Sequence, residues 1–307
     1  WSSEWKKAWS AVGYFFAKKL AQELGVTVGI IGCNWGGTSA SAWMRKEYLE
    51  TDKDLKTYLD EQEEATKGKS IQQQCEEYDK YTKENDEWQK KCAELYNTTP
   101  NIEWDEVQKI LGPCQWPGPK SCKNPYRPTG LYDCMLSRIL PYTLKGVLWY
   151  QGESDDHKPA SYYKLFTRMI DNWRTDWDDI TLPFIFVQLP EHRYKQDKDY
   201  KNWCLIREAQ TKTSQTIQNA FMTVGAGLGE YNDIHPKAKK ALGERMTLTA
   251  LGCVYKTVSE KSALSPILNS VFVNENKLVL YFDNAQTGFV CKEDKETKEH
   301  YKELELI

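Results

Sequence analysis

Short apolar runs alternate along this chain with longer segments in which apolar residues recur every three or four positions. The apolar runs predict four buried strands, at Val26–Cys33, Val147–Tyr150, Phe184–Leu189 and Phe221–Val224. Helical spacing predicts amphipathic helices at Trp5–Leu24, Tyr132–Leu140, Ala160–Trp173, Trp203–Thr216 and Lys237–Leu251, with a further helix start at Ala40–Met44. Strands that alternate with helices predict an α/β protein, a three-layer αβα arrangement around a parallel sheet.

Three segments depart from this alternation. Residues 51–112 are rich in Asp, Glu, Lys and Gln, and their apolar positions predict an inserted helical hairpin, broken near Gly68, that packs on the main body or on a partner. Residues 112–130 are rich in Pro and Gly and predict an irregular loop. Beyond Tyr255, the runs Val271–Val273 and Lys277–Phe282 predict a β-hairpin. We therefore expect a main domain over residues 1–255 and the start of a β module over 256–307.

The first predicted helix, Trp5–Leu24, has no strand before it. Doubly wound sheets usually have five or more strands, and their chain normally begins with one. We therefore expect a further strand upstream of Trp1, whose carboxyl-end loop would lie at the same rim of the sheet as Gly36, Gln151 and His235.

Charge and composition exclude several classes of partner. The 307 residues carry a net charge of -3, without a long run of like charge or an apolar run near the ~18 residues of a membrane span, so no nucleic acid or membrane partner is expected. Four histidines and nine cysteines without a C-x-x-C pair predict no metal site, and no cofactor is expected. The odd cysteine count favours a reducing compartment, and so the cytoplasm, with secretion as the alternative. Cys114 and Cys122 flank the Pro/Gly-rich loop and could pair.

Two loops that follow predicted strands could form the wall of a binding site. The strand at Val147–Tyr150 ends in Gln151-Gly152-Glu153-Ser154-Asp155, and ligands bind at the carboxyl ends of strands in open parallel sheets. Gly36 and Gly37 form a strand-to-helix turn in which backbone N–H groups can approach a ligand closely. The alternative for residues 151–155 is an ordinary solvated loop. The alternative for Gly36 and Gly37 is a tight turn that needs glycine only for its positive φ.

His235 is the histidine best placed for chemistry, in the stretch Asn232-Asp233-Ile234-His235-Pro236 directly before a predicted helix. A histidine beside an acid suits a general base, because the carboxylate orients the imidazole and stabilises its cation. The alternative is a helix start capped by Asp233, with a passive His235. The candidate nucleophiles Ser39, Ser41 and Ser154 do not stand at a strand-to-helix elbow, so the nucleophile is expected outside this chain, with Ser39 or Ser154 as possible substitutes.

Several stretches, in order along the chain, resemble the sialate O-acetylesterase family, which are SGNH-type hydrolases related to acetylxylan esterases. They are Ser10–Phe16, Trp35–Thr38 with Ala42–Met44, Arg127–Tyr132, Lys145–Asp155, Leu182–Pro190, Ile206–Gln210 and Asn232–Lys237. The resemblance implies hydrolysis of acetyl esters on a sugar, with sialic acid favoured over xylan-type sugars as the substrate. A non-catalytic carbohydrate-binding relative is the alternative.

The resemblance also assigns roles to residues. It implies that His235 is the general base, with Asp233 or Glu230 as its acid. Gly36 or Gly37 would give an oxyanion-hole N–H, and Gln151 a side-chain donor beside it.

Substrate contacts are expected at Arg207, Arg127 and Glu153. The two arginines are expected because an arginine pairs well with a carboxylate of the substrate.

Two departures from the family pattern concern the triad. The Gly-Gln-Ser-Asn block that carries the family's serine is absent, and Asn232 stands where many such enzymes have Asp. The serine is therefore expected from the protein's own N-terminal segment or from a second chain.

Overall fold

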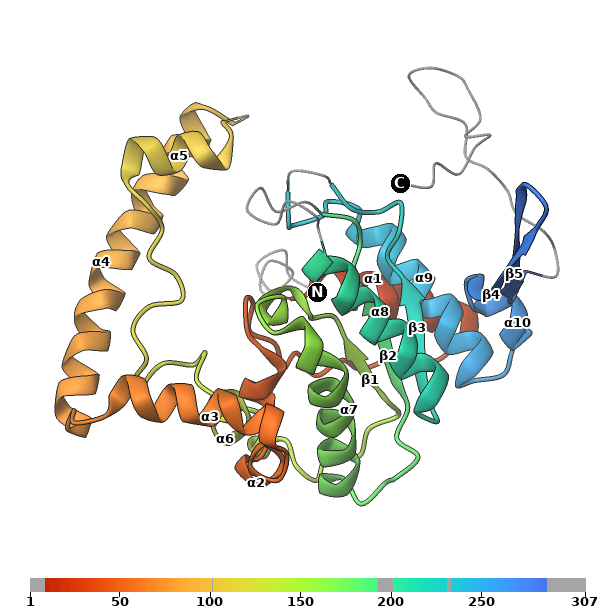
Figure 1. The fold of residues 1–307 in the computed structure, drawn as a ribbon, viewed down its shortest axis with the longest axis horizontal. Coiled ribbons are helices and arrows are strands. Elements are labelled where there is room, and N and C mark those ends of the chain that lie inside the picture. Colours follow the sequence, from red (N-terminus) through yellow and green to blue (C-terminus); the bar gives the residue numbers. More distant parts are fainter. Residues whose placement is uncertain (1–8, 101, 193–200, 231–232, 286–307) are drawn as a thin grey trace.

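The computed structural model describes residues 9–100, 102–192, 201–230 and 233–285 (Figure 1). Its centre is a parallel sheet of β1 (Val147–Trp149), β2 (Phe184–Gln188) and β3 (Ala220–Val224), in the order β1-β2-β3. The register pairs Val147 with Phe184, and Phe184 in turn with Ala220. The α/β class with a parallel sheet, predicted from the sequence, is confirmed.

Helices cover both faces of this sheet. Alternate residues of β2 point to opposite faces: Ile185 and Val187 pack with α1 (Ala11–Leu24) and α9 (Lys239–Cys253). Phe184 and Phe186 pack on the other face with α7 (Pro159–Asp176) and α8 (Lys201–Thr216). The predicted three-layer arrangement is therefore present.

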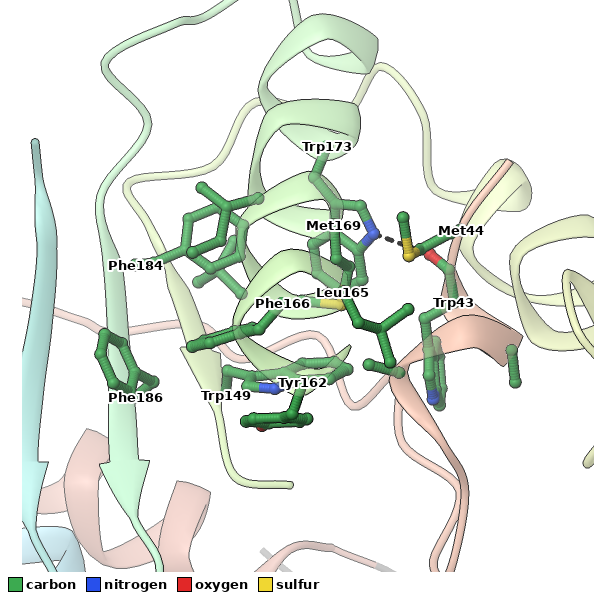
Figure 2. Close-up of a cluster of buried hydrophobic side chains, with 14 of the residues drawn as sticks. Trp43, Met44, Trp149, Tyr162, Leu165, Phe166, Met169, Trp173, Phe184 and Phe186 are labelled. Carbon is green, nitrogen blue, oxygen red and sulfur yellow. Dashed lines mark hydrogen bonds between the residues drawn. The ribbon is translucent and has the colours of Figure 1, made fainter. Parts of the chain in front are cut away.

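The larger core cluster lies between the sheet and α7, as Figure 2 shows. The ring centroids of Phe166 and Phe186 are 5.0 Å apart, and those of Trp149 and Trp173 are 5.6 Å apart, both in edge-to-face contact. The Trp173 indole donates a hydrogen bond to the backbone oxygen of Trp43. This bond ties the short 3-10 helix η2 (Ala40–Trp43) to α7, and so fixes the segment that follows Gly36 and Gly37.

The α1 helix has a capped start and packs closely against α9. The Ser10 hydroxyl accepts a hydrogen bond from the N–H of Gly13 and caps α1, which therefore begins at Ala11. The part of the predicted helix before residue 9 lies outside the described residues. The two helices approach closely at Gly243, where an added Cβ would lie 2.8 Å from the backbone oxygen of Val12. A larger residue at 243 would therefore separate the two helices.

The strand predicted at Val26–Cys33 is wrong. No residue of this segment pairs with a described strand, although Val28 and Ile30 still pack against the core between α1 and α9. β1 pairs only with β2 among the described strands, so its other edge has no partner there. An apolar, β-branched run becomes a strand only where a neighbour accepts its backbone hydrogen bonds, which composition alone does not reveal.

The polar insertion forms an arm that projects from the body (Figure 1). It contains α3 (Lys53–Thr66), α4 (Ile71–Thr98) and α5 (Trp104–Leu111), which follow the short α2 (Lys46–Glu50). The predicted break near Gly68 lies between α3 and α4, as expected. The α4 helix has 28 residues, which at 1.5 Å per residue corresponds to a length of about 42 Å.

The remaining elements are short. The helix predicted at Tyr132–Leu140 is divided into α6 (Gly130–Cys134) and the 3-10 helix η3 (Leu136–Arg138), and η4 (Glu153–Asp155) follows β1. After α10 (Glu260–Ala263), β4 (Ile267–Asn274) and β5 (Lys277–Asp283) pair as the predicted antiparallel hairpin. The division into domains at residue 255 stays a prediction. Of the helices in the described ranges, none has the length and apolar composition that a membrane span requires.

Candidate active site

The loops that carry the predicted site residues meet at the carboxyl edge of the sheet. The Gln151 side chain, just after β1, donates a 3.0 Å hydrogen bond from Nε2 to the backbone oxygen of Thr38. A small cavity is lined by residues from three rim loops, including Tyr150, Pro190 and Pro236. The loop after β1 is therefore a neighbour both of the turn at Gly36 and Gly37 and of the loop before α9.

The Gly36-Gly37 turn is open to a ligand. Within the described ranges, neither backbone N–H of this pair donates a recorded hydrogen bond, and both residues are exposed. Gly37 has φ +71°, and an added Cβ would lie 2.8 Å from the Trp116 ring. Sequence reasoning did not single out Trp116, which is 48% exposed, or Trp35, which is 47% exposed. The exposed Trp116 indole thus lies against the predicted oxyanion hole, and Trp35 directly precedes it in the sequence.

Asp155 is the centre of a buried hydrogen-bond network beside this turn. Its Oδ1 accepts hydrogen bonds from the Ser39 hydroxyl at 2.5 Å and from the Tyr58 hydroxyl at 3.2 Å. Its Oδ2 accepts from the backbone N–H of Ala40 at 2.9 Å and from Gln151 Nε2 at 2.6 Å. Burial raises the pKa of Asp155, and these donors oppose the shift. The carboxylate therefore joins η2, α3 and the loop after β1.

The Gln151 amide is fully engaged in this network. Its two Nε2 hydrogens have acceptors in Thr38 and Asp155, and its Oε1 accepts a hydrogen bond from the Tyr162 hydroxyl at 3.2 Å. In this arrangement Gln151 positions the two site loops. Its predicted role as an oxyanion donor stays a prediction, and requires the release of one of these bonds.

His235 lies at the exposed side of the rim, with its side chain 87% exposed. Its backbone N–H donates a 2.8 Å hydrogen bond to Asp233 Oδ1, and the same oxygen lies 3.7 Å from His235 Nδ1. The carboxylate of Glu230, the alternative acid, instead accepts a hydrogen bond from the backbone N–H of Lys237 and forms an ion pair with the Lys237 ammonium group. The geometry therefore favours Asp233 over Glu230 as the neighbour of the imidazole.

No hydroxyl of the described residues is hydrogen-bonded to the His235 ring. The Ser39 hydroxyl contacts Asp155 and Ser41, and no hydrogen bond is recorded between Ser154 and His235. The arrangement gives no support to Ser39 or Ser154 as a substitute nucleophile.

A second histidine, which sequence reasoning passed over, lies near His235. The His192 ring is 5.2 Å from the Trp203 ring, and the Trp203 indole donates a hydrogen bond to the backbone oxygen of Pro190. Burial holds the pKa of His192 below its usual value, and the charge of His235 acts in the same direction. The only sequence signal for His192 was its place after β2, at the carboxyl edge.

Glu153 carries an unusual carboxyl group for a residue at a strand end. Its pKa is raised to about 7, chiefly by burial and to a smaller extent by the nearby charge of Asp155, while a backbone hydrogen bond and the ammonium group of Lys239 oppose the shift. Burial also lowers the pKa of Lys239. At neutral pH Glu153 is therefore present in both protonation states, so it can either donate or accept a hydrogen bond at the rim.

Glu153 should make the stability of the protein depend on pH. Because its folded pKa of about 7 exceeds the usual 4.5, the free energy of unfolding falls as pH rises between these values. The full loss is about 3 kcal/mol, from ~1.36 kcal/mol per pKa unit. Urea unfolding at pH 4.5–8 should show this slope in the native protein and not in Glu153→Gln. The control Glu208→Gln, at an exposed position of α8, should keep it; equal slopes in Glu153→Gln and the native protein would contradict the assignment.

The two predicted substrate arginines have different surroundings. Arg127 uses its guanidinium within its own loop, where it donates to the backbone oxygen of Cys122 at 3.0 Å and to the Thr129 hydroxyl at 3.1 Å. Arg207, on α8, has a buried Nε without a hydrogen-bond partner among the described residues. Of the two, Arg207 is the one with an unused donor.

Among the described residues, no three His, Cys, Asp or Glu side chains gather in a group that could hold a metal ion. The described residues present at this edge backbone N–H groups without a recorded partner, an exposed imidazole with its carboxylate, and a carboxyl group with a pKa of about 7.

Comparisons with known proteins agree with the resemblance. Residues 111–251 match a family model described as carbohydrate esterase, sialic acid-specific acetylesterase. The sialate O-acetylesterase of Mus musculus is 26% identical over 262 residues, which cover 80% of this chain and 43% of the mouse protein. That of Homo sapiens is 24% identical over 266 residues, which cover 81% of this chain and 40% of the human protein.

The structural comparison extends the match over most of the chain. The crystal structure of a carbohydrate acetylesterase from Xanthomonas citri aligns with a TM-score of 0.60 and 28% identity, over 89% of this chain and 47% of that chain. The chain thus spans less than half the length of these relatives. The SGNH-type α/β fold that the resemblance implied is confirmed.

Proposed function

We propose that this chain, a relative of the sialate O-acetylesterases, forms most of the active site of a carbohydrate O-acetylesterase that removes acetyl groups from sialic acid. The observation that carries the proposal is that two loops at the carboxyl edge of the sheet, both beside the loop after β1, present two unlike groups. The free N–H groups of Gly36 and Gly37 suit an anion, and the exposed His235 beside Asp233 suits proton transfer.

The proposed reaction is acyl transfer in two steps. A serine hydroxyl attacks the acetyl carbonyl carbon while His235 takes the hydroxyl proton, and Asp233 stabilises the resulting imidazolium. The N–H groups of Gly36 and Gly37 bind the oxyanion of the tetrahedral intermediate. The C–O bond to the sugar then breaks, and His235 returns the proton to the leaving sugar oxygen. Water, deprotonated by His235, hydrolyses the acetyl-serine to acetate and free serine.

The serine is proposed to come from outside the described residues, on the protein's own N-terminal segment or on a second chain. The free edge of β1 and the unpaired segment Val26–Cys33 support this, because a strand at this edge would end at the same rim as Gln151. In parallel sheets the loop after such a strand reaches the ligand site.

A fluorophosphonate probe, which reacts with activated serines, tests the proposal on the full-length protein as it is naturally produced. Acetate release from O-acetylated sialic acid is measured before and after labelling, and the labelled peptide is identified by mass spectrometry. We expect loss of acetate release and a label on a serine outside this sequence. A label on Ser39 or Ser154 would contradict the proposed source of the nucleophile, and labelling without any acetate release would contradict the acetylesterase.

Arg207 is the proposed contact for the carboxylate of sialic acid, because its Nε has no hydrogen-bond partner among the described residues. Arg207→Gln should raise KM for O-acetylated sialic acid about tenfold, which is the range of one charge-assisted hydrogen bond. KM for an acetylated neutral sugar should not change. The matched control is Arg168→Gln, at an exposed arginine of α7 that pairs with Asp171. An equal rise of KM for both sugars would contradict this contact, and faster hydrolysis of acetylxylan would favour the xylan-type alternative.

The second candidate function is a non-catalytic carbohydrate-binding protein. It is favoured by the absence of a hydroxyl bonded to the His235 ring within the described part of the chain. Binding of O-acetylated sialic acid by the full-length protein, without acetate release and without fluorophosphonate labelling, would support this alternative.

A further inference from the structure

The arm has very little hydrophobic core of its own. Among the 28 residues of α4, Cys92 is the one that is buried, and Ile71 at the start of the helix is 72% exposed. Helices in proteins owe most of their stability to the packing of an apolar face. The α4 helix therefore depends on other contacts, which come from α5, where the Trp104 ring contacts that of Trp88, and from the irregular return segment, residues 112–123.

The return segment is held against the first turns of α4 at adjacent residues. The Ser121 hydroxyl donates a 2.9 Å hydrogen bond to the backbone oxygen of Gln74, and the backbone N–H of Cys122 donates at 3.0 Å to Gln74 Oε1. Lys123 forms an ion pair with Asp79 one turn further along α4. These contacts place residues 121–123 beside residues 74–79.

The sulfurs of Cys75 and Cys122 lie 3.8 Å apart at this crossing. A disulfide needs about 2.05 Å between the sulfurs, and rotation of the two side chains about χ1 can close such a gap. Cys122 is exposed, so a small oxidant can reach it, and Cys75 is partly buried beneath it.

We propose that Cys75 and Cys122 form a disulfide bond that staples α4 to the return segment. With a low-molecular-weight disulfide such as oxidised glutathione as the oxidant, the Cys122 thiolate first attacks and releases one glutathione thiolate. The Cys75 thiolate then attacks Cys122 in the mixed disulfide and releases the second. Two protein thiols lose two protons and two electrons, and one glutathione disulfide becomes two glutathione thiols.

The structure favours the pair Cys75–Cys122 over the pair Cys114–Cys122 that the sequence suggested. No sulfur contact is recorded between Cys114 and Cys122, although they are eight residues apart in the same segment. Cys114 instead lies near Cys92, whose pKa is raised mainly by burial and further by the charge of Cys114. The carbonyl of Gly112 accepts a hydrogen bond from the Trp88 indole. Cys114 therefore faces a part of α4 some four turns beyond Cys75.

The staple would also hold residues of the candidate active site. Trp116, which lies over Gly37, is in the return segment, and the backbone oxygen of Cys122 accepts the hydrogen bond from Arg127. Because disulfides persist in oxidising compartments, the proposal favours the secreted alternative over the cytoplasm.

The test is a map of thiols and disulfides in the full-length protein. The protein is incubated with a defined mixture of oxidised and reduced glutathione, free thiols are alkylated, and the tryptic peptides are analysed by mass spectrometry. We expect one cross-linked species that joins the Cys75 and Cys122 peptides and is 2 Da lighter than the two reduced peptides, and its loss after dithiothreitol. Full alkylation of both cysteines in the oxidising mixture, or a cross-link of either to another cysteine, would overturn the proposal.

Limited proteolysis supplies a second readout that does not depend on activity. Oxidation should slow cleavage of the arm about tenfold or more, since a cross-link suppresses local opening. Cys122→Ser should cleave at the reduced rate in both conditions, while Cys134→Ser, at an exposed cysteine of α6, should behave like the native protein. An identical cleavage rate in oxidised and reduced native protein would contradict a staple.

Discussion

Replacing His235 with alanine is expected to lower kcat/KM for O-acetylated sialic acid about 1,000-fold or more. General acid–base catalysis contributes about 100- to 10,000-fold, and a histidine in a serine triad also activates the nucleophile, so both effects are lost together. A factor of 1,000 corresponds to about 4 kcal/mol of transition-state stabilisation. The measurement is acetate release by the full-length protein at saturating and sub-saturating sugar.

The control for this variant is His157→Ala. His157 is exposed in the loop after η4, and its ring contacts the Tyr58 ring edge-on. It should keep acetate release within about twofold of the native protein. If His235→Ala retained more than a tenth of the native kcat/KM, His235 would not be the general base, and the proposed mechanism would be wrong.

Replacing Asp155 with alanine is expected to lower the free energy of unfolding by about 3–5 kcal/mol. The substitution removes the acceptor for four buried donors, which belong to Ser39, Ala40, Tyr58 and Gln151. Buried donors left without an acceptor cost about 1–3 kcal/mol each before relaxation, and loss of one partner in a buried charged network costs about 3–5 kcal/mol. Chemical denaturation at pH 7 measures the difference.

Two further variants test whether the loss of stability comes from this hydrogen-bond network or from the removal of a charge in general. Asp155→Asn keeps one acceptor oxygen and should lose less stability than the alanine variant. Asp171→Ala removes an exposed carboxylate of α7 that pairs with Arg168, and should cost less than about 1 kcal/mol. A loss in Asp155→Ala as small as that in Asp171→Ala would mean that the four donors find other partners.

The strands of the main sheet were predictable because burial on both faces leaves continuous apolar runs. β2 is the clearest example, since Phe184 and Ile185 face opposite layers and are both buried. The run at Val26–Cys33 has the same composition, yet it is unpaired in the described structure. Strand formation there depends on a neighbour distant in sequence, and no local pattern contains that information.

The candidate site was predictable only in its parts. Gly36, Gly37, Gln151 and His235 were identified because each follows an apolar run. The parallel topology explains the place of the loops after β1 and β3, whereas the turn at Gly36 and Gly37 follows an unpaired segment and is held beside β1 by the bond from Gln151 to Thr38. The contact of Trp116 with Gly37 joins positions 79 residues apart through the return of the arm, so sequence spacing could not reveal it.

The same limit applies to the surroundings of the predicted residues. Asp155 appeared as one polar residue in a loop, and its bonds to Ser39 and Tyr58 depend on how η2 and α3 pack against that loop. The unpaired Nε of Arg207 likewise became visible only once α8 was packed.

The free edge of β1 has a consequence for the behaviour of the chain in solution. Among the described strands this edge has no backbone partner, and an unpaired strand edge is a template for pairing with another copy. Any fragment that leaves this edge bare is thus prone to aggregate through it.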